Sequence, residues 1–535
     1  MRMQPILASV VVAGLFVGTP VLAGDNDELD TRMDDALAQS SAEEAAQADQ
    51  QAATGEAEDG QDQPQSREIR GRTGAGDTGP GQLRAMQFGQ GDMEVTSGTA
   101  FNPAISVILD GAYYNEFSGH VEDPAGFDTG HGHDHGHGGH DHGFSDGFNL
   151  REVELVFEGT VDPYFDMMVQ LAAFEEGIEI EEAFITTRSL PAGWQVKAGR
   201  FLSDVGYINQ QHLHDWQFAD QPWVIENMFG EEGLVDNGIQ LSWMPGTESY
   251  TRFGVELLQG EGVPGIAEYE GDGNHDVVTV LPQYMDDPDM DWDDEDAYRN
   301  DRIRWRDNTG FEETTPPNLA TFFANWAPNL GYAHDLQLGV SYGVSDVLQR
   351  QEAHSSGRLE TWDGDSEFWG LDAVYKYNGQ GIHGHRNFVL QAEYFNREQD
   401  LHYMSRNFAD LDTLEPTGGD DPDVRDQRWK QDGLYVQGVY GFAPRWNAGL
   451  RVDAMGLTND AYTDQDAGRG LPVEPDPSYR YSAQMSWLPT EFSRIRGQLN
   501  YNDVGGDGYG GHSHDAWEFI LQYNMAIGVH GAHDF

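Results

Sequence analysis

Basic side chains are scarce in this 535-residue sequence, and cysteine is missing altogether. Thirty lysines and arginines stand against 92 aspartates and glutamates, which gives a net charge of −62. Nucleic acid is disfavoured as a partner because phosphate binding requires a basic surface. The acidity fits either a surface that attracts cations or a general adaptation to salty surroundings. The lack of cysteine is compatible with an oxidising periplasm but decides little about location.

Long apolar runs are also missing, and the mean hydropathy is −0.60. A membrane-spanning helix requires about 20 consecutive apolar residues, and no segment after the first residues approaches that length. The chain starts with Met1-Arg2, an apolar run over 6–17 and a small-residue cleavage site. This pattern predicts a secretory signal peptide over 1–23, cleaved after Ala23. An exported chain without membrane helices can enter a membrane only through β-strands.

The sequence also lacks the motifs of common catalytic sites. The sequence has no G-x-S-x-G, no H-E-x-x-H and no P-loop. Pairs of acidic residues carry no weight in a chain that contains 92 of them. We therefore expect that the protein is not an enzyme.

Alternation of apolar and polar residues is the main feature that is present. In the stretch 516–535, apolar side chains occupy every second position from Trp517 to Val529. This period is typical of a strand with one apolar and one polar face. About sixteen such segments follow one another, an even number as bacterial outer-membrane barrels require. The sequence predicts an all-β fold over 101–535, a transmembrane antiparallel β-barrel of about 16 strands. The polar residues of the last strand are expected to line the lumen: Glu518, Gln522, Asn524 and His530.

The connections between these segments alternate in length. Short turns alternate with long connections at 116–148, 203–235, 261–318, 345–366, 399–431, 456–478 and 503–514. Short periplasmic turns and long extracellular loops are the polarity of outer-membrane barrels. An aromatic girdle at one interface is expected beside the short turns. The tryptophans in that position are Trp194, Trp243, Trp326, Trp446 and Trp487.

The region between the signal peptide and the barrel has a different composition. Residues 24–100 are acidic, low in aromatic side chains and rich in alanine and glutamine. Such a segment cannot bury enough apolar surface to fold. It is predicted to be a mostly disordered, low-complexity extension in the periplasm.

A histidine-rich tract in the first long connection is the strongest local signal for a binding site. Six imidazoles and two carboxylates lie within twelve positions, with glycines between them. Imidazole together with carboxylate suits zinc, copper, nickel or cobalt, and the flexible tract is expected to bind several ions loosely. The alternative is a solvated loop without a specific role. The candidate ligands are His131, His133, Asp134, His135, His137, His140, Asp141 and His142.

A second candidate site lies in the third long connection, at 209–216. Porins commonly fold this loop into the lumen as a constriction, so His212, His214 and Asp215 are expected to meet permeating ions there. The alternative is that these side chains fasten the loop to the barrel wall by hydrogen bonds. The sequence leaves both interpretations open.

Several stretches between 101 and 535 together resemble a known family. They are Phe101-Asn-Pro-Ala-Ile, Glu181-Glu-Ala-Phe-Ile, Lys197-Ala-Gly-Arg-Phe, Gly206-Tyr-Ile-Asn-Gln-Gln-His-Leu-His-Asp-Trp and the ending His530-Gly-Ala-His-Asp-Phe. Together they look like the bacterial outer-membrane proteins labelled zinc-regulated TonB-dependent receptors. The third stretch also distantly resembles phosphate-selective porins. The resemblance implies zinc uptake across the outer membrane of a Gram-negative cell.

Taken together, these features favour a porin-like outer-membrane channel that aids uptake of divalent metal, above all zinc. The histidine-rich tract would be an extracellular capture loop, and Zn²⁺ would be carried or loosely held rather than structural. Two alternatives stay open: a general cation-preferring porin with an incidental tract, and a TonB-dependent metal receptor. Large TonB-type transporters have a plugged lumen, and the region before Phe101 is short and polar for such a plug. The partners to expect are outer-membrane lipid, divalent metal ions and, as in porins, two further copies in a homotrimer.

Overall fold

The computed structural model describes residues 103–528 except 122, 125, 128–143, 175–176, 270–273, 281–301, 309–310, 312–313, 354–357, 408–422, 465–474 and 507–512. The signal peptide, the extension at 24–100, the histidine-rich tract at 131–142 and His530 lie outside the described residues. None of the helices in the described part of the chain has the length and apolar character needed to cross a membrane.

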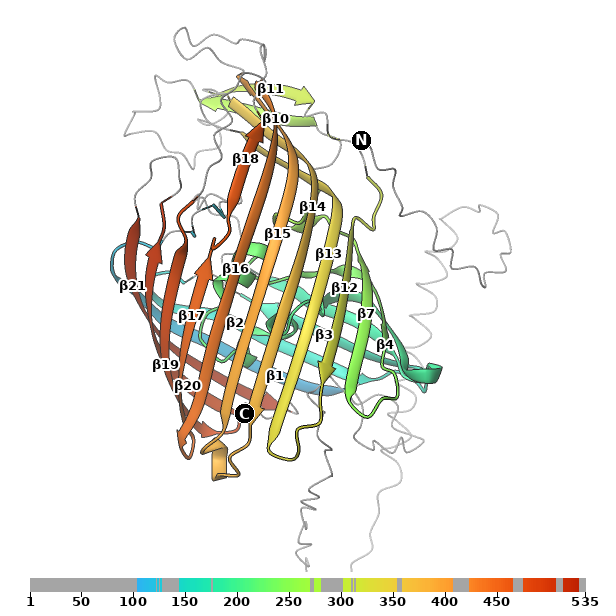
Figure 1. Cartoon of the computed structure of the whole chain (residues 1–535), viewed down its shortest axis with the longest axis vertical. Coiled ribbons are helices and arrows are strands. Elements are labelled where there is room, and N and C mark those ends of the chain that lie inside the picture. The colour runs from blue at the N-terminus through green and yellow to red at the C-terminus, as the bar shows by residue number, and fades with distance from the viewer. Residues whose placement is uncertain are drawn as a thin grey trace, which may run out of the picture. The chain divides into compact units, whose positions relative to one another are not determined.

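Sixteen strands form one closed antiparallel ring (Figure 1). Each strand pairs with the next strand of the ring, and β21 pairs back onto β1 from Ser106↔Gly528 to Ser118↔Trp517. The predicted all-β barrel of sixteen strands is therefore confirmed. Its strands are β1 (Ala104–Ser118), β2 (Gly147–Thr160), β3 (Phe165–Ala173), β4 (Ile178–Thr187), β5 (Trp194–Leu202), β6 (Val235–Trp243), β7 (Tyr250–Leu258), β12 (Leu319–Ala327), β13 (His334–Ala353), β14 (Arg358–Tyr377), β15 (Phe388–Asn407), β16 (Asp423–Ala443), β17 (Trp446–Met455), β19 (Ser478–Thr490), β20 (Ser493–Val504) and β21 (His514–Gly528).

The remaining elements lie in the connections. Strands β10 and β11 form a separate hairpin, whereas β18 pairs with the far end of β16. One α-helix, α2, occurs in the described residues and lies between β5 and β6. The bounds of these elements are β8 (Gly262–Val263), β9 (Ala267–Glu268), β10 (Asn274–Val280), β11 (Arg302–Asn308), β18 (Asp460–Asp464), α2 (Trp223–Phe229), and the 3-10 turns η1 (Pro191–Gly193), η2 (Ile208–Gln210), η3 (Leu213–Asp215) and η4 (Ile382–Gly384).

The strands differ in length around the ring. Strands β13, β14 and β15 have 20 residues each, whereas β3, β5 and β6 have nine. Because a strand crosses a membrane in roughly 9–11 residues, the long strands continue beyond the bilayer. The predicted long connections at 345–366 and 399–431 were therefore wrong. Outside the bilayer both faces of a strand meet water, so the apolar alternation that marks strands in the sequence fades there.

The side of the barrel with short turns carries the predicted tryptophan girdle. Trp194 faces Trp243 across the β5–β6 pair with ring centroids 5.8 Å apart. Trp446 faces Trp487 across β17 and β19 at 6.0 Å. With Trp326, these side chains are 36–46% exposed, which places the rings on the outer surface. The indole rings lie where interfacial aromatic residues anchor a barrel.

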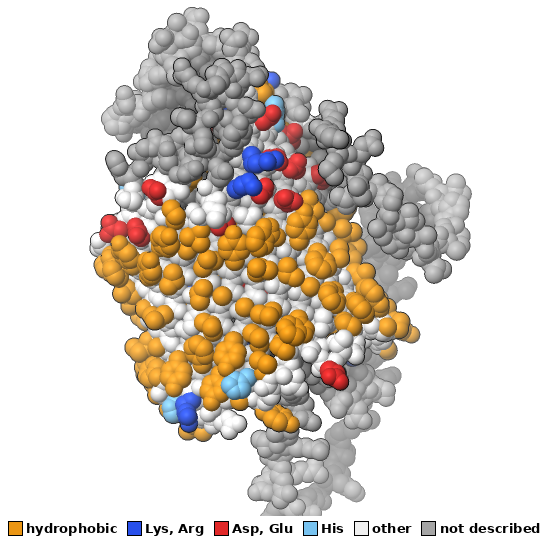
Figure 2. Space-filling view, in the orientation of Figure 1, with side chains coloured by type: hydrophobic (Ala, Val, Ile, Leu, Met, Phe, Trp, Pro, Cys, Tyr) orange, Lys and Arg blue, Asp and Glu red, His pale blue; other side chains and the backbone are white. Residues whose placement is uncertain are grey.

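An apolar belt covers the outer surface below a rim of charged side chains (Figure 2). Strand β21 shows how the sequence makes this belt. Leu521, Tyr523 and Met525 are exposed on the outside, whereas Gln522 and Asn524 are buried inside the ring. A belt of this size needs a hydrocarbon environment, which a bilayer provides. The molecule is a transmembrane β-barrel.

The connection between β5 and β6, residues 203–234, folds into the barrel; we call it the inner loop. Its helix packs Phe229 edge-on against Phe368 of β14 and Phe395 of β15, with ring centroids 5.2 and 5.1 Å apart. A Cβ at Gly370 would overlap the Phe395 ring, so glycine leaves the space for this ring to lie on the wall. The interior thus holds an apolar core between the loop and the wall.

Candidate functional site

The inner loop contacts the polar part of the wall at two places. The first, the histidine–glutamate cluster, brings loop imidazoles to acidic wall residues. The second, the arginine clamp, brings Asp220 and loop carbonyl groups to arginines of β2, β17, β19 and β20. The cluster comprises Glu152, Glu154, Glu181, Glu182, His212 and His214; the clamp comprises Asp220 with Arg151, Arg451, Arg480, Arg494 and Arg496.

Two β-bulges add extra residues to the wall, one at the cluster and one at the clamp. Between β3 and β4 the register jumps from Gln170↔Glu182 to Leu171↔Ile180, so Glu181 is an additional residue. Between β1 and β2 it jumps from Asp110↔Glu152 to Gly111↔Leu150, which leaves Arg151 as the additional residue. A bulge lets two consecutive residues point to the same face of a strand. The wall therefore presents more polar groups here than a regular alternation would allow.

His214 lies on one side of the cluster and is fully enclosed. Its Nδ1 is 2.7 Å from Glu154 Oε1, and its carbonyl oxygen accepts a hydrogen bond of 2.6 Å from Arg494 Nη2. Its Nε2 lies 3.7 Å from Asp215 Oδ2. Burial, together with the nearby charge of His212, outweighs the carboxylate of Asp215 and lowers the pKa of His214 below its usual 6.5. The ring is therefore neutral at pH 7, the state in which imidazole binds metal.

His212 stacks parallel to His214 with ring centroids 6.0 Å apart, yet its surroundings differ. Its Nε2 is 2.9 Å from Glu182 Oε2, and its Nδ1 is 3.8 Å from Glu181 Oε2. Burial alone would lower the pKa of His212, but the hydrogen bond and charge of Glu182, with Glu181 and Glu154, raise it well above 6.5. Without a bound cation, this ring carries a proton.

The cluster contains two groups of side chains that could hold a metal ion. Glu152, Glu154 and His214 form one group, and Glu154, Glu181 and His212 form the other. In each group the possible ligand atoms lie within 4.8 Å of one another. One imidazole with two carboxylates is a ligand set for borderline divalent metals such as zinc. The arrangement can bind a cation between the inner loop and strands β2 to β4.

The arginine clamp holds the loop by its main chain. Arg151 donates to the carbonyl oxygen of Ala219 at 2.7 Å, and Arg496 donates to that of Trp216 at 2.8 Å. Arg480 donates to the carbonyl oxygen of Gln221 at 2.6 Å. Charge-assisted hydrogen bonds of this kind are shorter and stronger than neutral ones. They fix the path of the loop through its main-chain carbonyl groups.

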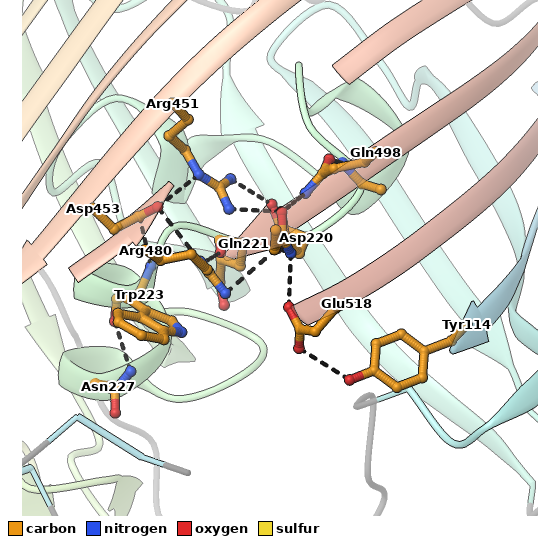
Figure 3. Close-up of polar contacts among 12 residues, drawn as sticks. Tyr114, Asp220, Gln221, Trp223, Asn227, Arg451, Asp453, Arg480, Gln498 and Glu518 are labelled. Atoms are coloured by element: carbon orange, nitrogen blue, oxygen red, sulfur yellow. Dashed lines mark hydrogen bonds and ion pairs between the residues drawn. The ribbon is translucent and has the colours of Figure 1, made fainter. Parts of the chain in front are cut away.

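Asp220 is the one acidic loop residue in the clamp, and its carboxylate is fully occupied (Figure 3). Arg451 Nη2 and Gln498 Nε2 both donate to Oδ1 at 2.6 Å, and Asn500 Nδ2 donates to Oδ2 at 2.8 Å. Arg480 adds an ion pair at 3.4 Å. Although burial opposes ionisation, these donors lower the pKa of Asp220 well below its usual 3.8.

Two of the wall arginines in the clamp, Arg451 and Arg480, also pair with a carboxylate of the wall, that of Asp453. Asp453 accepts from Arg451 Nε at 2.9 Å and from the backbone N–H of Trp223 at 3.1 Å. The guanidinium of Arg480 also lies 4.8 Å from the centre of the Trp223 ring (Figure 3). Two carboxylates therefore face two guanidinium groups at the centre of the clamp.

Of the site residues predicted from the sequence, the structure brings two together on the barrel wall. His212 and His214 come together on the wall, whereas Asp215 beside them is 42% exposed. The eight tract residues at 131–142 lie outside the described part of the chain. The sequence did not single out Asp220 or the four glutamates as site residues. Two signals for them existed: the broken alternation at Glu182 and the inward arginines on β17, β19 and β20.

Comparison with known proteins gives one close relationship in sequence. An "Uncharacterized protein" of Aquifex aeolicus (strain VF5) is 31% identical over 455 residues, which is 82% of this chain and 80% of that protein. The chain belongs to the same family as that protein. No family model matches it.

Solved structures share the general architecture at low identity. The outer-membrane channel DcaP of Acinetobacter baumannii is 12% identical, with 80% of this chain and 96% of that chain covered and a TM-score of 0.40. OprB of Pseudomonas putida is 9% identical, with 80% of this chain and 94% of that chain covered and a TM-score of 0.40. An anion-selective porin from Comamonas acidovorans is 12% identical, with 80% of this chain and 99% of that chain covered and a TM-score of 0.35. At these scores the likeness adds nothing to the strand pairing described above.

Proposed function

We propose that this barrel is a channel that aids uptake of divalent metal, with zinc as its cargo. The observation that carries the proposal is the pairing of His212 and His214 with wall glutamates inside the barrel. Imidazole and carboxylate in one group select borderline metals over sodium and potassium. In a channel, a group of this kind beside the inner loop would bind the ion on its way through the interior.

The two sides of the inner loop differ in a way that supports this route. Helix α2 packs apolar side chains against β14 and β15, where Phe229 meets Phe368 and Phe395. On the other side, the loop meets the acidic residues of β2 and β4. An ion avoids apolar surface because it would lose its hydration there. The passage for a cation therefore lies on the side of the histidine–glutamate cluster.

Zinc uptake into liposomes tests the role of the cluster. The purified full-length chain is reconstituted around a zinc-sensitive dye, and the initial rate is compared with those of His214→Gln and His402→Gln. His402 is a matched control because it also pairs with a carboxylate, Asp426 at 2.9 Å, but lies exposed at the rim. We expect a loss of roughly tenfold or more in apparent zinc affinity for His214→Gln and none for the control. Equal rates for all three proteins would contradict the proposal.

The histidine-rich tract supports the proposal as an extracellular capture loop. Replacing its six histidines at 131–142 with serine removes the imidazoles and keeps the loop length. We expect slower uptake at low zinc concentration and an unchanged rate at saturation, because the tract would only raise the local concentration of the ion. Unchanged uptake at every zinc concentration would mean that the tract is incidental.

A general cation-preferring porin is the second candidate, and the surplus of acidic groups inside the barrel favours it. Single-channel recording in potassium chloride separates the two. A zinc channel with an internal binding site shows a potassium current that micromolar zinc interrupts, and His214→Gln abolishes the interruption. A general porin carries the same potassium current with or without zinc.

A TonB-coupled receptor is a further alternative. The liposomes described above contain no TonB and no proton gradient. Zinc entry under these conditions supports a passive channel and counts against a coupled receptor. Binding without entry would favour the receptor.

A further inference from the structure

We propose that the carboxylate of Glu154 bridges two divalent cations. One ion has Glu152 and His214 as its other ligands, and the second has Glu181 and His212. The proposal rests on the proposed function because it takes the same class of cargo and the same cluster. It goes further by fixing the number of ions and assigning each ligand.

The shared position of Glu154 is the first observation. Glu154 is the one residue common to both possible metal groups. Its two oxygens point to different partners: Oε1 lies 2.7 Å from His214 Nδ1, and Oε2 accepts from Gln170 Nε2 at 2.9 Å. A carboxylate whose oxygens serve two neighbouring groups has the geometry of a bridging ligand.

The surroundings of the Gln170 amide show where the second ion would lie. Its Nε2 is 2.9 Å from Glu154 Oε2, 2.9 Å from Glu181 Oε2 and 2.9 Å from His212 Nδ1. An amide nitrogen has only two protons to donate. The carboxylates of Glu154 and Glu181 can take both of these protons, whereas Nδ1 of His212, which bears a proton in the metal-free ring, cannot accept one. A divalent cation beside this amide would displace the imidazole proton and take one atom from each of the three side chains as a ligand.

The side chain of Glu152 provides independent evidence for the position of the first ion. This side chain is 3% exposed, and its Oε1 has no hydrogen-bond partner in the described part of the chain. Leaving a carboxylate oxygen buried and unpaired costs free energy. A metal ion bound with His214 and Glu154 would supply the missing partner.

The charges around the cluster point the same way. Four glutamates meet two imidazoles, and the nearest cations are already engaged. Lys197 Nζ lies 3.5 Å from Asp204, and Arg151 Nη1 lies 3.6 Å from Asp110. Arg494 donates to two carbonyl oxygens of the loop, those of His214 and Trp216. Carboxylates this close together and this deeply buried need a proton or a cation between them, and added cations would meet that need.

The ligand set limits the metals that fit. Each ion would have one imidazole and two carboxylates, one of them bridging, with the remaining positions left to water. Zinc, manganese, iron, cobalt and nickel accept such mixed ligands, whereas calcium and magnesium prefer oxygen alone. Two ligands about 2.1 Å from one zinc ion lie about 3.4 Å apart in a tetrahedral site. Ligand atoms within 4.8 Å therefore need shifts of about an ångström to close on the ion.

Counting bound zinc in single variants tests the bridge. The full-length chain with its six tract histidines replaced by serine is loaded with zinc, desalted and measured by elemental mass spectrometry. We expect two ions per chain, none in Glu154→Gln, and one each in Glu152→Gln and Glu181→Gln. Glu398→Gln, which alters an ion pair with Lys430 near the rim, should keep both ions. Loss of a single ion in Glu154→Gln would overturn the bridge.

A spectroscopic measurement covers the case in which a variant fails to fold. The unsubstituted chain is loaded with Mn²⁺ alone and examined by electron paramagnetic resonance. Two ions bridged by one carboxylate lie roughly 3.5–4 Å apart and give an exchange-coupled spectrum. Only the six-line spectrum of isolated ions, at any loading, would overturn the proposal.

The two proposals can fail separately. Two bound ions without zinc entry into liposomes would support the bridged site and contradict the channel. Zinc entry that depends on His214, together with one ion per chain, would contradict the bridge and leave the channel standing. A chain that binds no zinc in the cluster, where a proton shared by Glu152 and Glu154 could take its place, would overturn the bridged site.

Discussion

The arginine clamp and the histidine–glutamate cluster attach the same loop to the same barrel by opposite arrangements. At the clamp the wall donates and the loop accepts, and Asp220 with Asp453 balances Arg451 and Arg480. At the cluster the wall supplies carboxylates that outnumber the two imidazoles of the loop. Around Asp220 the charges are paired, so this part of the clamp needs no ligand. A contact with surplus buried acceptors gains free energy from a cation.

This difference bears on the two interpretations that the sequence left open for His212 and His214. Fastening the loop is a task that the clamp performs through main-chain carbonyl groups, as the contacts at Ala219 and Gln221 show. The imidazoles are not needed for that task. The comparison therefore favours ion binding as the role of the cluster, and three predictions test how far the two contacts are independent.

The largest effect is expected from Asp220→Asn. The substitution leaves Arg451 and Arg480 buried without their counter-charge, and breaking a buried pair costs about 3–5 kcal/mol. Amide exchange over 216–229, measured by mass spectrometry in lipid nanodiscs, should accelerate by roughly 100-fold or more. Zinc binding at the cluster should change far less.

Asp400→Asn is the matched control for this prediction. Asp400 also pairs with an arginine, Arg428 at 2.5 Å, but the two side chains are 49% and 53% exposed. Exposed pairs contribute about 0–1 kcal/mol, so exchange over 216–229 should stay unchanged. If both substitutions have the same small effect, the clamp does not hold the loop.

A local effect of intermediate size is expected from zinc. A ligand at about 100 times its Kd stabilises the state that binds it by about 2.7 kcal/mol. Amide exchange over 208–215 should therefore slow by roughly 100-fold in zinc, whereas exchange over 216–229 should not respond because Asp220 already has its counter-charges. Removing zinc with EDTA should reverse the change. Equal protection of both segments would mean that the two contacts act as one unit.

The smallest effect is expected from mild acid at the clamp. Because the pKa of Asp220 is lowered, its contribution to docking is present above the usual 3.8 and is lost only as the pH falls below that value. Exchange over 216–229, corrected for its intrinsic pH dependence, should change by less than roughly twofold between pH 7 and pH 4.5. A large loss of protection in that range would show that the carboxylate is not held ionised. The groups that face it are Arg451, Arg480, Gln498 and Asn500.

Prediction from the sequence succeeded where the pattern is local. The alternation over 516–528 indicated which side chains of β21 face inward, and the structure buries Gln522 and Asn524 as expected. The short turns and their tryptophans identified one rim of the barrel. The sequence did not predict that β13 to β16 extend beyond the bilayer. Strands outside the bilayer have water on both faces, so they lack the alternation of apolar and polar residues by which a strand is recognised.

The sequence predicted the two histidines of the cluster as site residues but none of its four glutamates. Glu152 and Glu154 alternate with apolar residues, and the alternation breaks at Glu182, but neither feature indicates a partner. A bulge becomes interpretable only when the register of the neighbouring strand is known, as Gln170↔Glu182 shows here. Asp220 gave no signal, since one aspartate among 92 acids looks like any other.

The sequence by itself determined the period of two, the even number of strands and the placement of apolar side chains on the outside. These follow from neighbours along the chain, because a strand alternates its faces whatever it pairs with. The tertiary structure decided which polar residues meet inside. Asp220 and Asn500 are 280 positions apart, and His214 and Glu154 are 60 apart. Only closure of the ring around the inner loop brings them within hydrogen-bond distance, and no local pattern encodes that closure.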